Sequence, residues 1–400
     1  MWSASKLLFL VLGSLLLAQG YEGYLSEQSS KTANDFSIDI LKTVFNRPNR
    51  NDNTVVSPVS LYCVLALLQQ GTGGSSLAEL TTVLHANSTA SREAYYNLTR
   101  SLKGEHNSAE VQFANKLFVK NGFEILPEFK NVAVQDFLSD IEAVDFLHAN
   151  EAAQAINSWV SQNTNQRIPK LVKPDMITAN TVLMLLNAVF FSGEWRNQFY
   201  PQATENNEFH TLGGAISRVP TMHFTKDVTA GHNPDIGAKF VTLPFRGNEF
   251  SMMLIVPDEI DGLSNVITRL QSEQLTSLMR HDERRRVQLS LPKFKFETTS
   301  DFVEILKQLG VSDIFETTAD LSGIASGRLV VSHVLQKAEI EVDEKGAKAS
   351  AATSVGINAK SGRVFPNKEL LEINADHPFL FFITDDKNKV PLFCGWVGVL

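Results

Sequence analysis

Two basic residues, Lys360 and Arg363, stand in a polar stretch, Lys360-Ser361-Gly362-Arg363, that a protease could cut. The stretch lies about 40 residues before the C-terminus. It follows a run from Gly346 to Asn358 in which Ala, Ser and Gly dominate. The chemistry that these residues indicate is therefore cleavage of this chain by another protein.

Residues that could catalyse a reaction are present, but they are not arranged for it. No serine has glycines both two residues before and two residues after it, which excludes the nucleophile elbow of hydrolases. No Gly-Lys-Ser/Thr sequence occurs, so a Walker-type phosphate loop is excluded. No two of the nine histidines lie within four residues, which removes the helical zinc motifs. A Ser-His-Asp site built from distant residues is the remaining alternative, and no motif supports it. We expect a protein that is not an enzyme and that binds no metal or cofactor.

The run of small residues continues a strand pattern. Upstream, Ala338, Ile340 and Val342 alternate with acidic residues, which predicts a half-buried strand. Gly346 interrupts the alternation, which then resumes in the other phase. One face would carry Ala347, Ala349, Ala351, Thr353, Val355 and Ile357, and the other Lys348, Ser350, Ala352, Ser354, Gly356 and Asn358. Two interpretations are open: a flexible surface linker, or an exposed strand small enough to enter a sheet later.

The N-terminus has the pattern of a secretory signal peptide. Residues 1–20 contain Lys6, an apolar run from Leu7 to Leu17 and small residues before the predicted cleavage at Tyr21. No later segment is apolar enough to span a membrane. The sequons at Asn87 and Asn97 fit a secreted glycoprotein. We therefore expect an extracellular protein without a membrane partner.

The composition and charge of the chain limit which classes of protein it can belong to. The chain is 43% hydrophobic and 20% charged, which is typical of globular proteins. Residues 21–400 contain no linker or break in composition, so we expect one domain. The net charge of −8 argues against nucleic acid as a partner. Cys63 and Cys394 lie in apolar runs, so two buried free thiols are favoured over one disulfide.

Helices and strands are mixed without regular βαβ alternation, which predicts an α+β fold with antiparallel sheets. A helix begins with Ser57 as its N-cap and ends at Gly71, and its middle is apolar all round. A second, amphipathic helix is predicted over 151–163 and a third over 301–310. The apolar run 181–191 predicts a central strand buried on both faces. Hairpins are predicted over 240–257 and 380–399.

Several ordered stretches resemble the serpin family of serine protease inhibitors, and the resemblance covers essentially all of residues 21–400. They are NTVVSPVSLYCVLALLQQGTGG, LLNAVFFSGEW, LSLPKFKFE, LKQLGVSDIF, VLQKAEIEVDEKGAKASAAT and INADHPFLFFI. The resemblance implies a serpin fold of three β-sheets and about nine helices, with an exposed reactive loop at about 344–372. It also implies a secreted, inhibitory and insect-like member that traps a trypsin-like protease as an acyl-enzyme while the cut loop enters the main sheet.

The resemblance also implies roles for individual residues. Glu344 is similar to the family's hinge glutamate, and Lys293 and Trp195 complete a cluster at the top of the main sheet, here called the breach. The shutter, a hydrogen-bonded cluster beneath the sheet, would consist of Ser57, Ser60, Asn187 and Gln336; Gln336 stands where the family often has a histidine. The hinge would consist of Glu344, Gly346, Ala347, Ala349, Ser350, Ala351, Ala352 and Thr353.

The scissile bond is implied by position. In the family it usually follows the fourteenth residue after the hinge glycine, which here gives Lys360-Ser361. Counting back from the C-terminal signature gives Arg363-Val364 as the alternative, because the segment from Lys360 to Phe379 is several residues longer than in familiar members of the family. Either basic residue would suit the acid-bottomed pocket of a trypsin-like protease.

A non-inhibitory serpin that carries a ligand or acts as a chaperone is the competing function. Such members commonly carry proline, charged or bulky residues in the hinge, and residues 349–353 have none. We expect a monomer whose covalent partner is a protease. We expect no glycosaminoglycan site, because the region Ser91–Lys103 offers only three basic residues and a sequon at Asn97.

Overall fold

The computed structural model describes residues 25–48, 52–102, 109–347 and 370–400. The α-helices of this part are α2 (Glu27–Phe45), α3 (Pro58–Gln69), α4 (Gly74–Val83), α5 (Ser88–Leu102), α6 (Pro127–Gln135), α7 (Ala149–Asn163), α8 (Leu263–Arg269), α9 (Ser272–Arg280) and α10 (Val303–Gln308). Three short 3-10 turns are η1 (Pro174–Met176), η2 (Pro201–Ala203) and η3 (Asp313–Phe315). The strands are β1 (Thr54–Val56), β2 (Ala109–Lys120), β3 (Asp140–Val144), β4 (Leu183–Glu194), β5 (Glu205–His210), β6 (Ile216–Asn233), β7 (Ala238–Pro244), β8 (Phe250–Pro257), β9 (Arg284–Pro292), β10 (Phe294–Asp301), β11 (Val331–Val342), β12 (Gly346–Ala347), β13 (Leu371–Asn374), β14 (Phe379–Asp385) and β15 (Val390–Val397).

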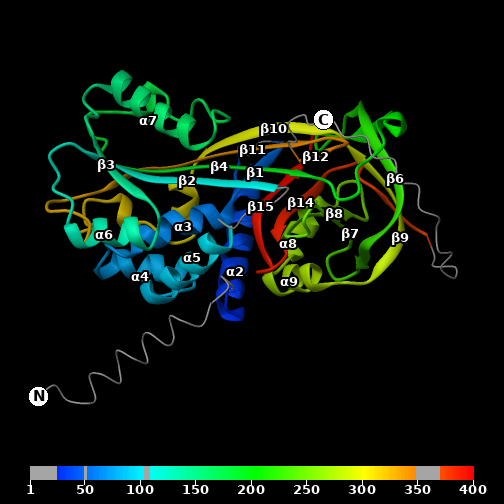
Figure 1. Cartoon of the computed structure of the whole chain (residues 1–400), viewed down its shortest axis with the longest axis horizontal. Coiled ribbons are helices and arrows are strands. Elements are labelled where there is room, and N and C mark those ends of the chain that lie inside the picture. The colour runs from blue at the N-terminus through cyan, green and yellow to red at the C-terminus, as the bar shows by residue number, and fades with distance from the viewer. Residues whose placement is uncertain (1–24, 49–51, 103–108, 348–369) are drawn as a thin grey trace, which may run out of the picture.

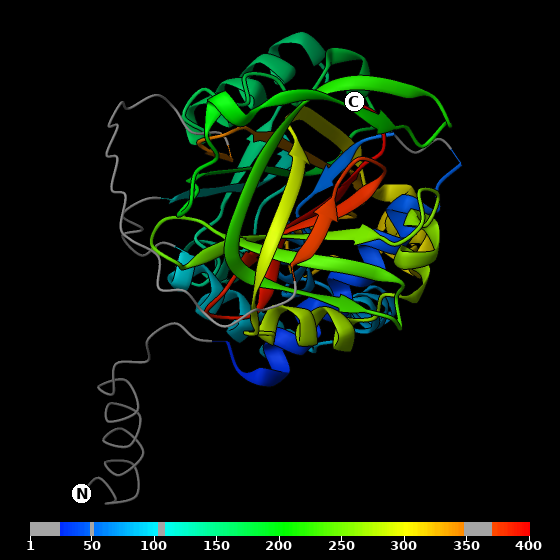
Figure 2. The same cartoon turned by 90° about the vertical axis from the view of Figure 1, so that its right-hand side faces the viewer.

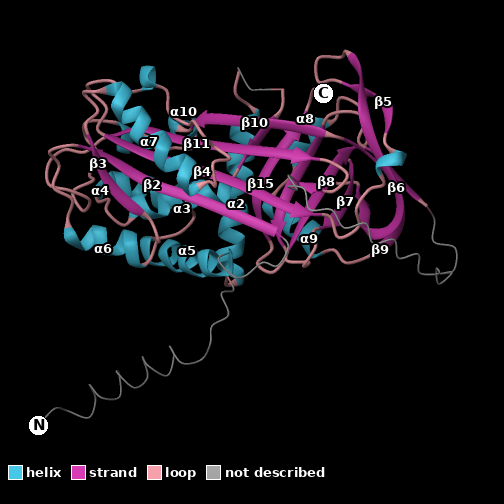
Figure 3. Ribbon diagram, turned by 45° about the horizontal axis from the view of Figure 1, so that its top comes forward, coloured by secondary structure: helices cyan, strands magenta, loops and turns pink. Residues whose placement is uncertain are grey.

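A six-stranded sheet in the order β10-β11-β12-β4-β2-β3 runs along the molecule, and its long strands lie side by side in Figure 3. Strand β4 is central, antiparallel to β2 and parallel to β11. Its first nine residues are all buried, as the apolar run 181–191 predicts. In Figure 1, α7 lies above this sheet, and α3, α4 and α5 lie below it.

The second sheet joins nine strands, in the order β1-β15-β14-β8-β7-β6-β9-β13, with β5 paired to β6. Figure 2 looks onto it, with β6 in green and β9 in yellow in front of the red C-terminal strands. The family resemblance implied three sheets, whereas the described residues form two hydrogen-bonded sheets. The reason is the long strand β6, which pairs with β5 through its first residues, with β9 over 221–229 and with β7 through its last five residues.

Most of the helix and hairpin predictions are confirmed. Helix α3 starts after Ser57, whose hydroxyl caps it, and all its residues are buried. The amphipathic helix predicted over 151–163 is α7, which begins two residues earlier. The two predicted hairpins are β7–β8 and β14–β15. The helix predicted over 301–310 is shorter, because Asp301 still pairs in β10 and its carboxylate accepts the backbone N–H of Val303.

Candidate functional site

The six-stranded sheet is split at one end by the two-residue strand β12. Gly346 lies opposite Glu194 of β4, and Ala347 lies opposite Gly193. Ala347 also pairs with Val342 of β11 on its other side. Farther along, β4 and β11 pair directly with each other. The sheet is therefore open to an inserted strand where β12 lies and closed along the rest of its length.

The two hinge positions in β12 require small residues. A Cβ atom on Gly346 would collide with the carbonyl oxygen of Gly193, so only glycine fits there. The side chain of Ala347 packs into the main core and the residue is 1% exposed. Both positions match the alternation that the sequence predicted across Gly346.

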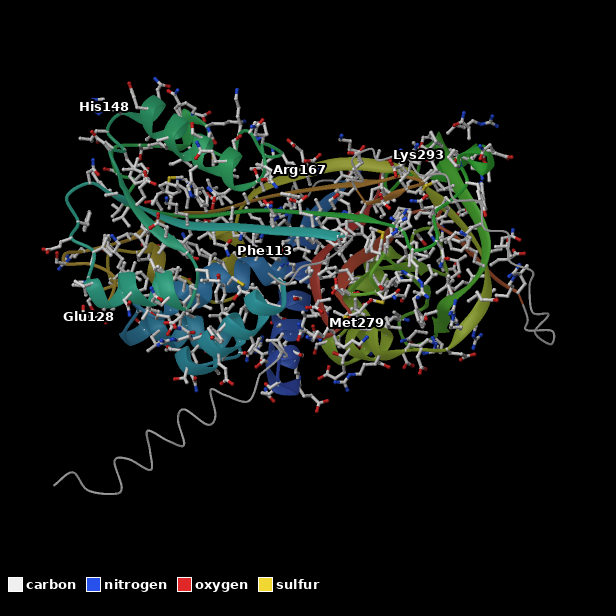
Figure 4. All side chains as sticks on the ribbon, in the orientation of Figure 1. Phe113, Glu128, His148, Arg167, Met279 and Lys293 are labelled. Atoms are coloured by element: carbon white, nitrogen blue, oxygen red, sulfur yellow. The ribbon has the colours of Figure 1, made fainter. Side chains whose placement is uncertain are left out.

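The breach residues meet beside the split, at the end of the sheet where Figure 4 labels Lys293. The Lys293 ammonium is 2.9 Å from a carboxylate oxygen of Glu344, and the Thr204 hydroxyl donates to the other oxygen at 2.8 Å. Trp195 lies against the same turn, because its indole N–H donates to the carbonyl of Asp343 at 2.8 Å. Thr204 was not predicted, and its position in the sequence carries no signal that would have found it.

The environment of Glu344 favours its ionised form. Burial acts to raise the pKa of this carboxyl, whose side chain is 13% exposed. The hydrogen bonds from Lys293, from the local backbone and from Thr204 outweigh that effect, so the pKa of Glu344 lies below its ordinary value. The ion pair is therefore formed at neutral pH and ties the turn before β12 to β9–β10.

The shutter residues form one buried network where β4, β11 and the start of α3 meet. The Gln336 amide nitrogen donates to the carbonyl of Ser57 and to Asn187 Oδ1, both at 2.9 Å. Gln336 Oε1 accepts the backbone N–H of Ser57 at 2.8 Å. The Asn187 amide donates in turn to the hydroxyl and to the carbonyl of Ser60. Gln336 thus both donates and accepts, and its contact with Asn187 joins β11 to β4.

Asn115 belongs to the same network and was missed from the sequence. It lies directly opposite Asn187 in the β2–β4 ladder, and its Oδ1 accepts from the Asn187 amide and from the Ser60 hydroxyl. The segment 111–119, VQFANKLFV, mixes polar and apolar residues, so no local signal marks Asn115 as a member of the shutter. Asn115 extends the network from β11 across β4 to β2.

Other predicted site residues have mixed outcomes. The scissile candidates Lys360, Ser361, Arg363 and Val364 lie outside the described residues, as do the hinge residues Ala349, Ser350, Ala351, Ala352 and Thr353. Asn87 is exposed and its side chain caps α5 by accepting the backbone N–H of Ala90, whereas Asn97 is half-buried on α5.

Both cysteines are buried free thiols, as the sequence favoured, and burial raises the pKa of each. In the described ranges no group of three or more His, Cys, Asp or Glu side chains is placed to hold a metal ion. None of the helices in the described part is both long and apolar enough to cross a membrane.

Comparison with known proteins agrees with this geometry. The family model described as "Serpin (serine protease inhibitor)" matches residues 31–398. Alaserpin of Manduca sexta is 32% identical over 98% of this chain and 99% of its own length. The leukocyte elastase inhibitor of Bos taurus is 32% identical over 92% of this chain and 98% of its own.

The chain belongs to the serpin family. A solved structure, the "highly specific serpin" Serpin48 of the insect Tenebrio molitor, superposes with a TM-score of 0.83 at 32% identity. It covers 94% of this serpin and all of its own chain. The family is one of protease inhibitors rather than catalysts. Within it, β12 of this serpin lies near the start of the segment, about 344–372, that the family resemblance assigns to the reactive loop.

Proposed function

We propose that this serpin is a secreted, monomeric inhibitor of a trypsin-like serine protease and acts as a suicide substrate. The observation that carries the proposal is β12, because the start of the hinge already lies between β4 and β11. The secretory pattern of residues 1–20 and the exposed sequon at Asn87 support an extracellular location.

The register of β12 defines where the rest of the hinge would lie after insertion. In both observed pairs the residue numbers of β12 and β4 add up to 540. If the strand continued in this register, Ala351 would lie opposite Val189, Thr353 opposite Asn187 and Ile357 opposite Leu183, the first residue of β4. The segment 348–357 is therefore long enough to fill the whole split.

The alternation of small side chains suits this position. The side chains of Val189 and Leu185 on β4 belong to the main core, whereas Leu186 and Ala188 face the smaller core under α7. In the inserted strand, Ala351 would lie opposite Val189 and Val355 opposite Leu185. The apolar face predicted from the sequence would thus point into the main core, and Lys348 would point to the side of α7. No proline or bulky residue of the hinge would have to enter between β4 and β11.

Insertion would be favourable because it adds hydrogen bonds. The direct pairing of β4 with β11 is one ladder, and an inserted strand would replace it with two. The gain is about ten net hydrogen bonds at roughly 1 kcal/mol each, or on the order of 10 kcal/mol. The intact protein would then be held in its uninserted state by a kinetic barrier, in which the breach ion pair and the Gln336–Asn187 contact both take part.

The chemistry would begin with attack by the serine of the protease on the carbonyl carbon of Lys360. The bond from Lys360 to the nitrogen of Ser361 breaks, Ser361 leaves with the proton relayed by the histidine of the protease, and an ester joins Lys360 to the protease. Lys360 lies only three residues beyond Ile357, so insertion would carry the ester to the far end of the sheet. Cleavage after Arg363 would place three more residues between the inserted strand and the ester. For this reason Lys360-Ser361 is the preferred bond.

The test is to mix the mature protein with trypsin, analyse the mixture on a denaturing gel and determine the mass of the released C-terminal fragment. We expect a complex that survives denaturation and a fragment that begins at Ser361. A fragment beginning at Val364 would move the bond to Arg363. Complete cleavage without a complex by trypsin and by a panel of other serine proteases would reject inhibition and favour a non-inhibitory serpin that carries a ligand or acts as a chaperone.

A further inference from the structure

Two residues each of β4 and β11 border a gap between the closed part of the six-stranded sheet and β12. The direct pairing of β4 with β11 ends at Phe190 and Glu339. Strand β12 pairs with Val342 of β11 and with Gly193 and Glu194 of β4. Between these positions no described residue pairs across the two strands. The residues that border the gap are Phe191 and Ser192 of β4 and Ile340 and Glu341 of β11.

The register of β12 determines which residues would fill the gap if the hinge continued as a strand. The residue numbers of β12 and β11 add up to 689 in their pair, and those of β12 and β4 add up to 540. The next residue, Lys348, would then lie between Glu341 and Ser192. Ala349 would follow, between the two apolar residues that border the gap. The first hinge residue to enter is therefore a lysine, and its direct neighbour on β11 is a glutamate.

Glu341 and Lys348 would project from the same face of the sheet. Ile340 and Val342 belong to the main core, so Glu341 between them points to the other face, on the side of α7. Lys348 would do the same, because Ala347 before it packs into the main core. Side chains directly opposite each other on antiparallel strands have Cβ atoms about 4.5–5.5 Å apart. An ammonium group at 348 would therefore reach the partly exposed carboxylate of Glu341.

The charges around the gap favour a cation. Nζ of Lys295 lies 3.0 Å from Oε2 of Glu341, and it comes from β10, on the opposite side of β11 from the gap. A carboxylate has a second oxygen that can accept from another donor. On the other border, Ser192 pairs with Glu110 of β2, whose Oε2 is 3.9 Å from Nη2 of Arg167. An ammonium group in the gap would thus meet one carboxylate directly and a second beyond the small side chain of Ser192.

We propose that Glu341 is a docking residue for Lys348 of this chain, and that their ion pair forms when the hinge fills the gap and speeds loop entry. The effect on speed rests on the proposed function, whereas the ion pair itself requires only that a cut loop enters the sheet. A small neutral residue would fill the gap as well as lysine does, so the charge at 348 acts through the carboxylate opposite. Loop entry competes with hydrolysis of the ester, so a faster first step leaves less cleaved, uncomplexed serpin.

The ion pair is tested by removing one charge at a time with side chains of similar size. Lys348→Met and Glu341→Gln, alone and together, are mixed with trypsin, and the ratio of cleaved to complexed serpin is measured on a denaturing gel. Each single variant should raise this ratio about threefold, which is the effect of one cross-strand ion pair. The double variant should raise it no further, because the pair is already lost. A rise of about ninefold in the double variant, or no rise with Glu341→Gln, would overturn the docking.

Charge reversal distinguishes an ion pair from a merely structural role of Glu341. Lys348→Glu places like charges opposite each other, with Glu339 diagonal to them, and should raise the ratio about tenfold at low salt. Adding Glu341→Lys should lower the ratio again at least about threefold, and high salt should shrink this difference. The matched control is Glu273→Lys, which reverses the partner of Lys31 at 3.2 Å on α9 and should not lower the ratio of Lys348→Glu. Equal ratios for Lys348→Glu with and without Glu341→Lys would contradict the ion pair.

If trypsin cleaves the loop and forms no complex, the proposed function fails and the cleaved protein decides the docking. Unfolding of cleaved and intact protein is followed by circular dichroism at low salt. The rise in midpoint on cleavage should be about 2 °C smaller in Lys348→Glu than in the wild type. Adding Glu341→Lys should recover most of that loss. Equal rises in the three proteins, including no rise in any of them, would overturn the docking.

Discussion

Glu344→Lys should release the hinge and make the protein polymerise on mild heating. The substitution removes the ion pair with Lys293 and the hydrogen bond from Thr204, and it places two ammonium groups side by side. The turn before β12 then keeps the hydrogen bond from Trp195 but loses its attachment to Lys293 and Thr204. The split between β4 and β11 opens more often, and the loop of a second molecule can enter it.

The size of the effect follows from the contacts. A hydrogen bond to a charged group contributes about 1.5–3 kcal/mol, and the 38% exposure of the Lys293 side chain puts its contribution at the lower end. Like-charge repulsion at a partly screened site adds about 1 kcal/mol. The sum is about 4 kcal/mol, which raises the population of the open split roughly a thousandfold.

The assay is size-exclusion chromatography after incubation below the unfolding temperature. The matched control is Glu341→Lys, which also reverses an ion pair between β11 and β10. Its partner is Lys295 at 3.0 Å, but both side chains of this pair face solvent, and the change should stay within about 1 kcal/mol. We expect polymers from Glu344→Lys and monomers from the control. A Glu344→Lys variant that stays monomeric, or a control that polymerises equally, would refute the argument that the breach restrains the hinge.

Three further predictions follow from the same geometry. Ala349→Pro and Thr353→Arg should each turn the inhibitor into a substrate, because neither new side chain can enter between β4 and β11. The control Asn367→Arg lies beyond the predicted bond and should still inhibit. Residual trypsin activity is the readout, and retained stoichiometric inhibition by Ala349→Pro or Thr353→Arg would contradict insertion. Lys360→Ala should abolish the trypsin complex and Arg363→Ala should preserve it, and the reverse result on a denaturing gel would assign the bond to Arg363. Desolvation raises the pKa of the half-buried Asp386 in spite of hydrogen bonds from Ser251 and Thr384, so its contribution to stability is present at low pH and lost as the pH rises through the raised value. Asp386→Asn should therefore unfold at a higher denaturant concentration than the wild type at neutral pH but not at acid pH, and equal midpoints at neutral pH would argue against a desolvated, ionised Asp386.

Local patterns predicted the elements of the site well. Ser57 before Pro58 marks a helix N-terminus, and the structure places its cap there. The apolar run of β4 marks a strand buried on both faces. The phase change at Gly346 indicates that the chain turns and begins a new strand, which is β12. Each of these signals acts over a few neighbouring residues, so it can be read from one sequence.

Contacts between distant segments were not predictable in the same way. Asn115 joins the shutter because the β2–β4 register places it opposite Asn187. Thr204 joins the breach because it directly follows η2. Neither placement is visible in local sequence. The strands form one nine-stranded sheet because β6 pairs with β9 over one part of its length and with β7 over another. The breach and shutter members that were named came from the family resemblance, because pairing between residues 51 to 279 positions apart leaves no periodic trace.

The most direct test of loop entry is the thermal stability of the protein after one cut in the loop. A protease that the serpin does not trap is used to cleave within 349–363, and unfolding of cut and intact protein is followed by circular dichroism. An added ladder of about 10 kcal/mol should raise the midpoint by at least about 10 °C. A midpoint that stays within about 2 °C of the intact protein would show that the cut loop remains outside the sheet and would contradict the mechanism.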